Sequence, residues 1–214
     1  MKAYEPSALD FLPAKSGIRS LRSAAAHCQA CDLYRHATQT VFGQGRLHAA
    51  LMLVGEQPGD SEDLAGRPFV GPAGKLLRRA TERAGIDAAD IYVTNAVKHF
   101  KFVMRGKRRI HATPKVTELR ACRPWLEAEV AAVKPRVVVA LGASAARSLL
   151  GASFRLTQHR GELFDAPPFG RVAATLHPSA ILRMRGSEER TREFERLADD
   201  LRVFARTAGL AVLG

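Results

Sequence analysis

Short apolar runs alternate along the chain with stretches in which hydrophobic residues recur every three or four positions. The apolar runs have the length of buried strands and cover residues 50–54, 91–97, 136–141 and 172–176. Helical spacing is found over residues 72–85, from Thr113-Pro114 to Val133, over 142–150 and over 187–206. Strands that alternate with helices predict an α/β fold. We expect a three-layer α/β/α domain around a central, mainly parallel four-stranded sheet.

The two ends of the pattern are less regular. Residues 1–15 have mixed polarity and contain two prolines, which predicts an N-terminal arm. A short helix is predicted over residues 16–27, and residues 158–164 predict a brief excursion or an edge strand. Residues 16–214 are long enough for one well-buried domain, and length alone requires no second one.

Polar residues stand at or just past the ends of the predicted strands. Glu56, Asn95, Ser144 and His177 occupy these positions. Because the carboxyl ends of parallel strands share one edge of a sheet, these residues predict a binding site there. The loop after the first predicted strand carries many carboxylates, which would repel a phosphate. We therefore do not interpret it as a phosphate-binding loop.

The charge of the chain favours a polyanionic partner. It has 33 Lys and Arg against 21 Asp and Glu, a net charge of +12 and a pI near 10.3. This balance favours nucleic acid over a merely solubilising surface. Residues 96–117 contain seven basic residues and no acid: Lys98, Lys101, Arg105, Lys107, Arg108, Arg109 and Lys115. No apolar run approaches the roughly 20 residues that span a bilayer, so we expect no membrane association. We also expect a cytoplasmic protein and a monomer.

Three cysteines and one histidine form a candidate metal site. Cys28 and Cys31 lie in a CxxC arrangement, which lets one turn of backbone place two thiolates on one cluster or ion. Cys122 and His99 complete a set of four ligands. On spacing alone, zinc and an iron–sulfur cluster are both open, and Cys122 is also compatible with a small buried hydrophobe.

Three segments resemble the iron–sulfur uracil-DNA glycosylases, the family 4 members of that superfamily. Residues 55–77 read GEQPGDSEDLAGRPFVGPAGKLL, close to the family signature GExPGxxEDxxGxPFVGxAGxLL. IYVTNAVK matches the family's VTNxVK, and LHPSAILR resembles its HPSxLLR. The resemblance implies a 4Fe–4S cluster on Cys28, Cys31, His99 and Cys122. His99 departs from the four cysteines usual in the family, and zinc stays the alternative.

The resemblance also implies roles at the strand ends. Phe69 would stack on a flipped uracil, Asn95 would read its edge, and His177 would donate to its O2 as negative charge develops. Gln57 and Asp60 would hold the geometry of the substrate site. Ser179 and Arg183 would shape the second signature loop and grip phosphate. The alternatives are a core aromatic for Phe69, a turn residue for Asn95 and a structural histidine for His177.

A further segment, Lys107-Arg108-Arg109-Ile110-His111, resembles the UdgX branch of the superfamily. That resemblance implies a covalent bond from His111 to C1′ of the deoxyribose after uracil leaves. Glu56 would orient the histidine or take its proton, and would offset charge on the sugar. Lys107, Arg108 and Arg109 would hold this loop closed or contact DNA. The alternative is a solvated basic flap with an incidental histidine.

The sequence therefore predicts a DNA repair enzyme that excises uracil from DNA, with single strands favoured, and becomes cross-linked through His111. The first alternative is an ordinary turnover glycosylase in which Glu56 directs water. The second is a non-catalytic, metal-bearing nucleic-acid-binding module. Glu56, Asn95 and His177 argue against that module, because binding alone has no need of them.

Overall fold

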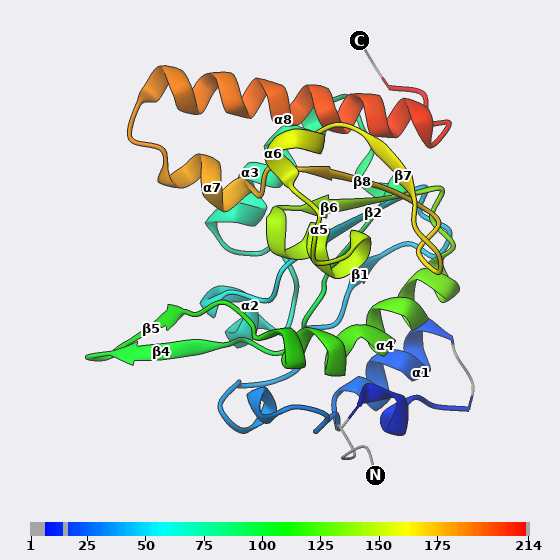
Figure 1. The fold of residues 1–214 in the computed structure, drawn as a ribbon, viewed down its shortest axis with the longest axis vertical. Coiled ribbons are helices and arrows are strands. Elements are labelled where there is room, and N and C mark those ends of the chain that lie inside the picture. Colours follow the sequence, from blue (N-terminus) through cyan, green and yellow to red (C-terminus); the bar gives the residue numbers. More distant parts are fainter. Residues whose placement is uncertain (1–6, 15–16, 213–214) are drawn as a thin grey trace.

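A six-stranded sheet forms the centre of the molecule (Figure 1). The computed structural model describes residues 7–14 and 17–212. The strands of the sheet are β1 (Gln44–Gly45), β2 (Leu51–Gly55), β3 (Ile91–Asn95), β6 (Val137–Leu141), β7 (Leu163–Asp165) and β8 (Arg171–Thr175). Their order is β1-β3-β2-β6-β8-β7. The four central strands are parallel, and the short strands β1 and β7 pair antiparallel at the two edges.

Helices cover both faces of this sheet, and a separate hairpin projects from the body (Figure 1). The α-helices are α1 (Ile18–Ala25), α2 (Asp60–Ala65), α3 (Pro72–Arg83), α4 (Val116–Val133), α5 (Ala143–Leu150), α6 (Leu156–His159), α7 (Pro178–Arg183) and α8 (Ser187–Thr207). Short 3-10 helices occur at η1 (Ala8–Phe11), η2 (Asp32–Arg35) and η3 (Ala88–Asp90). The hairpin consists of β4 (Phe102–Arg105) and β5 (Arg108–His111).

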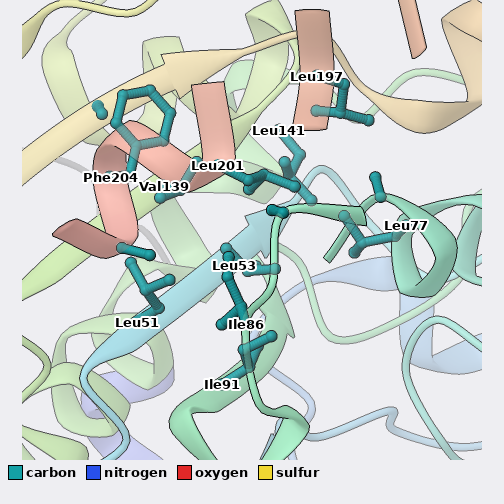
Figure 2. Packing of buried hydrophobic residues seen from close by; sticks show 14 of the residues in the cluster. Leu51, Leu53, Leu77, Ile86, Ile91, Val139, Leu141, Leu197, Leu201 and Phe204 are labelled. Carbon is teal, nitrogen blue, oxygen red and sulfur yellow. The ribbon is translucent and has the colours of Figure 1, made fainter. Parts of the chain in front are cut away.

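Alternate residues of the central strands face two different cores. On one face, Leu51 and Leu53 of β2 pack with Leu77 of α3 and with Leu201 and Phe204 of α8 (Figure 2). On the other face, the alternate residues of β2 and β6 pack against α4 and α5, in a cluster that includes Met52, Val54, Val138, Leu126, Val130, Ala145 and Leu149. Because helices cover both faces of the sheet, its central strands carry apolar residues on both sides.

A third cluster joins the N-terminal segment to α4. Leu21 of α1 and Trp125 of α4 are buried together with Cys28 and Cys122. Residues 7–14 of the predicted arm belong to this region, because Ala8 is fully buried in the same cluster. The rest of the predicted arm lies outside the described residues.

The fold class predicted from the sequence is confirmed, with local corrections. The expected four-stranded sheet is extended by β1 and β7, so the sheet has six strands. The loop expected up to Pro72 contains α2, and the basic segment after β3 contains the β4–β5 hairpin. Thr113 and Pro114 do not begin α4: its N-cap is Lys115, whose N–H donates to the Glu118 carboxylate at 2.6 Å. Among the described residues, the helices are all too short or too polar to cross a membrane.

Candidate active site

A cavity of about 860 Å³ opens at the carboxyl ends of the parallel strands. This is the edge at which ligands bind in open α/β sheets. Its lining contains eight of the residues predicted to contact substrate or DNA: Glu56, Gln57, Phe69, Asn95, His111, His177, Ser179 and Arg183. Ser144, the fourth predicted strand-end residue, also lines it. The parallel strands therefore bring together side chains from distant parts of the chain.

Asn95 lies at the end of β3, directly opposite Gly55 of β2 in the strand register. Its side chain is almost fully buried, at 3% exposure. A Cβ atom at Gly55 would stand 2.3 Å from Asn95 Oδ1 and 2.9 Å from Phe69 Cζ. Glycine is therefore required at position 55, because it alone leaves space for both side chains.

Phe69 is held in a backbone conformation that phenylalanine rarely adopts. Its φ angle is +55°, in the left-handed region. Helix α3 packs directly against this backbone, since a Cβ at Gly74 would lie 1.8 Å from the Phe69 carbonyl oxygen. The ring faces His177 with 6.2 Å between ring centroids and 28° between ring planes. Left-handed backbone at a bulky residue is a strained feature that concentrates at binding sites.

His177 presents one defined ring nitrogen to the cavity. Its Nδ1 accepts a hydrogen bond from the Ser179 backbone N–H at 3.1 Å and lies 2.8 Å from Ser179 Oγ. Burial, with smaller contributions from Arg183 and His111, lowers the pKa of His177 to about 4. A neutral imidazole whose Nδ1 is an acceptor carries its proton on Nε2. His177 is thus a neutral hydrogen-bond donor at pH 7.

His111 ends β5 and faces a carboxylate. Its Nε2 is 3.6 Å from Glu56 Oε1, longer than a hydrogen bond but close enough for electrostatic attraction. Glu56 Oε1 is buried and has no hydrogen-bond partner among the described residues. The imidazole is about half exposed, at 48%, and the carboxylate 20%. An unpaired buried carboxylate oxygen beside a histidine is the arrangement that a developing positive charge would stabilise.

Gln57 fixes the base of the hairpin that carries His111. Its Nε2 donates to the Lys101 and Ala112 carbonyls, at 3.1 and 3.0 Å. Its Oε1 accepts from the Lys101 N–H at 2.9 Å. The amide therefore bonds the residue before β4 and the residue after β5. This side chain was predicted to hold the site's geometry, and its contacts act on the backbone next to His111.

Arg109 and Asp60 do not line the cavity. Asp60 was predicted to hold the geometry of the substrate site, and Arg109 to hold the loop closed or contact DNA. Arg109 Nε donates to Asp60 Oδ1 and its Nη1 donates to Asp63 Oδ2, both at 2.6 Å. The guanidinium also lies over the rings of Phe100 and Phe102. These contacts tether the hairpin to α2. Asp63, which is fully buried, was not predicted, although Asp60 and Asp63 have the i,i+3 spacing of one helix face.

The tip of the hairpin is basic and exposed. Gly106 and Lys107 form the turn, with Gly106 at a φ of +58°, and Arg105 faces Arg108 across the two strands. Within the part of the chain that the structure describes, Arg105, Lys107 and Arg108 have no ion-pair partner. These cations are available to an anionic ligand.

A buried ion pair that was not predicted holds the backbone of Asn95 in place. The Lys98 ammonium contacts the Glu129 carboxylate, and the two side chains are 1% and 0% exposed. Lys98 Nζ also donates to the Asn95 carbonyl and to Thr94 Oγ1, both at 2.7 Å. The burial of Lys98 was not predicted, because lysine is rarely fully buried unless paired. Nothing in the basic segment distinguished Lys98 from its exposed neighbours.

Of the predicted metal ligands, the three cysteines lie in the third core cluster or at its edge. Cys28 Sγ accepts from Trp125 Nε1 at 3.2 Å, and Cys122 Sγ accepts from the Lys98 N–H at 3.3 Å. Burial, with a smaller contribution from the neighbouring thiols, raises the pKa of Cys31 and raises that of Cys122 to about 12. The three thiols are therefore near one another. His99 is buried, and burial lowers its pKa to about 4.

The chemistry of these donors suits metal ligation. N–H donors to two of the sulfurs and a neutral His99 favour the ligating forms, whether the bound group is a single ion or a cluster. Among the described residues, no three His, Cys, Asp or Glu side chains are gathered closely enough to hold one metal ion.

Fold and site together define an α/β/α protein with a cavity of mixed polar and apolar lining and a basic hairpin at the carboxyl edge of its sheet. Residues 42–202 match the family model of the Uracil DNA glycosylase superfamily. The chain belongs to the uracil-DNA glycosylase superfamily. It is 35% identical to a Type-4 uracil-DNA glycosylase of Pyrobaculum aerophilum, over 78% of this chain and 85% of that protein. It is 38% identical to that of Thermotoga maritima, over 76% and 82%, and 34% identical to that of Archaeoglobus fulgidus, over 80% and 87%.

Proposed function

We propose that this chain excises uracil from DNA, preferentially from single strands, and remains bonded to the resulting deoxyribose through His111. The observation that carries the proposal is the position of His111, whose Nε2 lies 3.6 Å from Glu56 Oε1 in the lining of the cavity. This buried carboxylate oxygen has no hydrogen-bond partner among the described residues. The names of the Type-4 relatives support uracil as the base. The bond to the deoxyribose is proposed from the position of His111.

Recognition of the flipped base falls to Asn95 and Phe69. The Asn95 amide offers a donor and an acceptor on one side chain, which matches the O4 and N3–H edge of uracil. Phe69 offers a ring face in the same cavity. Both side chains are rigidly supported, Asn95 by its buried position and Phe69 by α3. Rigid support lowers the cost of holding a base in the reactive geometry.

Departure of uracil begins with stretching of the bond between C1′ and N1. The electron pair stays on uracil, whose O2 gains negative charge, and the sugar approaches an oxocarbenium ion. The Nε2–H of neutral His177 can donate to O2 throughout, since the pKa of His177 is lowered to about 4. The carboxylate of Glu56 offsets the positive charge on the sugar.

Capture follows when a lone pair of the His111 imidazole forms a bond to C1′. The alkylated ring is cationic until its other N–H proton leaves, and Glu56 stands near enough to stabilise that charge. The anchors at Gln57 and Arg109 hold the hairpin against the cavity, which favours imidazole over diffusing water. The bond to C1′ then has a poor leaving group, so water does not readily reopen it.

We also propose that Cys28, Cys31, His99 and Cys122 hold a 4Fe–4S cluster. Such a cluster would tie the segment around Cys28 to the loop after β3, which leads into the hairpin. Three unpaired cysteines fit the reducing cytoplasm, where we place this chain as a monomer. Anaerobically prepared protein should contain iron and sulfide and show broad visible absorbance. Stoichiometric zinc without sulfide would exclude the cluster.

An ordinary turnover glycosylase is the second candidate, because the free Glu56 oxygen could also orient water. The two are separated by mixing the protein with a uracil-containing single-stranded oligonucleotide and running a denaturing gel beside a uracil-release assay. Capture predicts a heat-stable shifted band and one uracil released per protein, and a thymine-containing oligonucleotide gives neither. His111→Ser should release uracil without the band. Repeated turnover by the parent, without a band, would contradict capture.

A further inference from the structure

The β4–β5 hairpin has two chemically different faces. Residues directly opposite in an antiparallel pair share a face, and successive residues alternate between faces. The register pairs Phe102 with His111 and Met104 with Arg109, which places these four on the inner face. It pairs Val103 with Ile110 and Arg105 with Arg108, which places these four on the outer face.

The inner face is anchored to the body of the protein through Arg109 and His111, while Met104, nearer the turn, is 57% exposed. Arg109 bonds Asp60 and Asp63 and lies over two phenylalanine rings. His111 extends into the cavity lining. Because this face is fixed, the hairpin cannot turn over to bury its outer face.

The outer face joins an apolar pair to free cations. Val103 is 51% exposed and Ile110 is 38% exposed, although both are aliphatic. Beyond them, Arg105 and Arg108 form a basic pair next to Lys107 in the turn. The hairpin projects away from the sheet and from the helices that cover it (Figure 1). An exposed aliphatic pair flanked by unpaired cations indicates a partner with flat apolar surfaces and regularly spaced negative charges.

Single-stranded nucleic acid has this combination, since its unstacked bases offer apolar faces and its backbone offers phosphates. The position of the outer face also favours single-stranded nucleic acid as the partner. Ile110 directly precedes His111, so the two side chains leave neighbouring residues, about 3.3 Å apart along the strand, toward opposite faces. A nucleotide in the cavity beside His111 therefore lies one residue along the hairpin from Ile110, within reach of its neighbouring nucleotide. Two copies of this hairpin would instead bring like charges together.

We propose that the outer face of the hairpin is a subsite for the nucleotide next to the excised one. Val103 and Ile110 pack against the face of its unpaired base, and Arg105 and Arg108 contact its phosphates. Aliphatic side chains commonly wedge against bases in this way. The subsite rests on the proposed function, and it would make the hairpin a selector for unpaired flanking bases as well as the carrier of His111.

The test uses a single-stranded oligonucleotide with one 2′-fluoro-2′-deoxyuridine, whose fluorine disfavours the cationic sugar and so blocks excision. Affinity is measured with an intact neighbouring base and with a tetrahydrofuran abasic unit in its place, on either side. We expect the parent to lose about fivefold to tenfold in affinity on one side only, since burying a base against aliphatic side chains contributes a modest apolar term. The double variant Val103→Ser/Ile110→Ser should bind both oligonucleotides equally.

Val203→Ser is the matched control, because Val203 is also 51% exposed but lies on α8. It should behave as the parent does. A second measurement needs no variant: 2-aminopurine at the neighbouring position should change fluorescence when the parent binds. Equal loss of affinity in parent and double variant, or an unchanged probe, would overturn the subsite. So would a hairpin-dependent dimer, or hairpin-dependent binding to anionic vesicles in place of the oligonucleotide.

Failure of the proposed function has a different signature. If the parent does not prefer the fluorinated uracil oligonucleotide to the matched thymine oligonucleotide, uracil recognition is wrong. In that case the affinity of Val103→Ser/Ile110→Ser for the strand as a whole still reports whether the outer face contacts DNA, because that comparison needs no uracil in the cavity.

Discussion

The ammonium group of Lys98 is buried directly against the carboxylate of Glu129, beneath the residue proposed to read uracil. Lys98 also donates to the Asn95 carbonyl, while Glu129 accepts from Tyr92 Oη at 2.8 Å and from the Gly43 N–H at 3.0 Å. The pair therefore connects β3, α4 and the segment before β1. It fixes the backbone at the end of β3.

Lys98→Met should destabilise the protein by about 3–5 kcal/mol, because it leaves the Glu129 carboxylate buried without its cation. Urea unfolding measures the change in free energy. Arg83→Met is the control: its partner Glu195 is half exposed, so a loss of at most about 1 kcal/mol is expected. A loss below about 1 kcal/mol for Lys98→Met would show that the buried pair contributes little.

Gly55→Ala should reduce uracil release by at least about 10²-fold, because the new methyl group would displace Asn95 and Phe69 from their positions. The single-turnover rate of uracil release measures this. Gly17→Ala is the control, since the nearest atom to a Cβ there is Ser20 Oγ at 3.8 Å. A rate within twofold of the parent would mean that these contacts do not set the geometry of the base.

The pH dependence of stability should carry a contribution from His177. Its pKa is lowered to about 4 in the folded protein, so between pH 6.5 and 4 the unfolded chain binds a proton that the folded chain does not. The contribution is present above pH 6.5 and is lost progressively as the pH falls from 6.5 to 4. Urea unfolding at pH 7 and pH 5 should show a larger loss in the parent than in His177→Gln. Equal losses would contradict a His177 that stays neutral in the folded protein.

Neutralising the hairpin tip should weaken the salt dependence of DNA binding. If Lys107 and Arg108 each bind one phosphate, Lys107→Gln or Arg108→Gln should reduce the slope of log K against log salt by about 0.7–1. Arg206→Gln, at the far end of α8, is the control and should leave the slope unchanged. An unaltered slope in both hairpin variants would mean that these residues shape the loop without touching the DNA backbone.

The sequence pattern located much of the cavity, for a simple physical reason. Apolar runs of five to seven residues place Glu56, Asn95 and His177 at the same edge of a parallel sheet, whatever the details of the helices. The resemblance then gave roles to residues in that lining, such as Phe69 and Ser179. Those roles stay predictions.

The hairpin and its anchors could not be read from the pattern. The segment around Arg109 alternates weakly and is rich in charge, so its strands depend on contacts with Asp60 and Asp63 from far away in the chain. Helix α2 spans six residues, too few for a helical period to be recognised. Lys98 looked like one more exposed cation, and only the packing of α4 against β3 makes it a buried partner of Glu129.

The proposed bond between His111 and deoxyribose can be tested by peptide mapping. The parent is incubated with a uracil-containing oligonucleotide, the DNA is digested to single nucleotides, and the protein is cleaved with trypsin. Cleavage after Arg109 and Lys115 isolates residues 110–115, in which His111 is the only histidine. We predict that this peptide carries the added mass of the abasic sugar, with fragmentation placing the mass on His111. An unmodified peptide, recovered while free uracil accumulates, would contradict the bond.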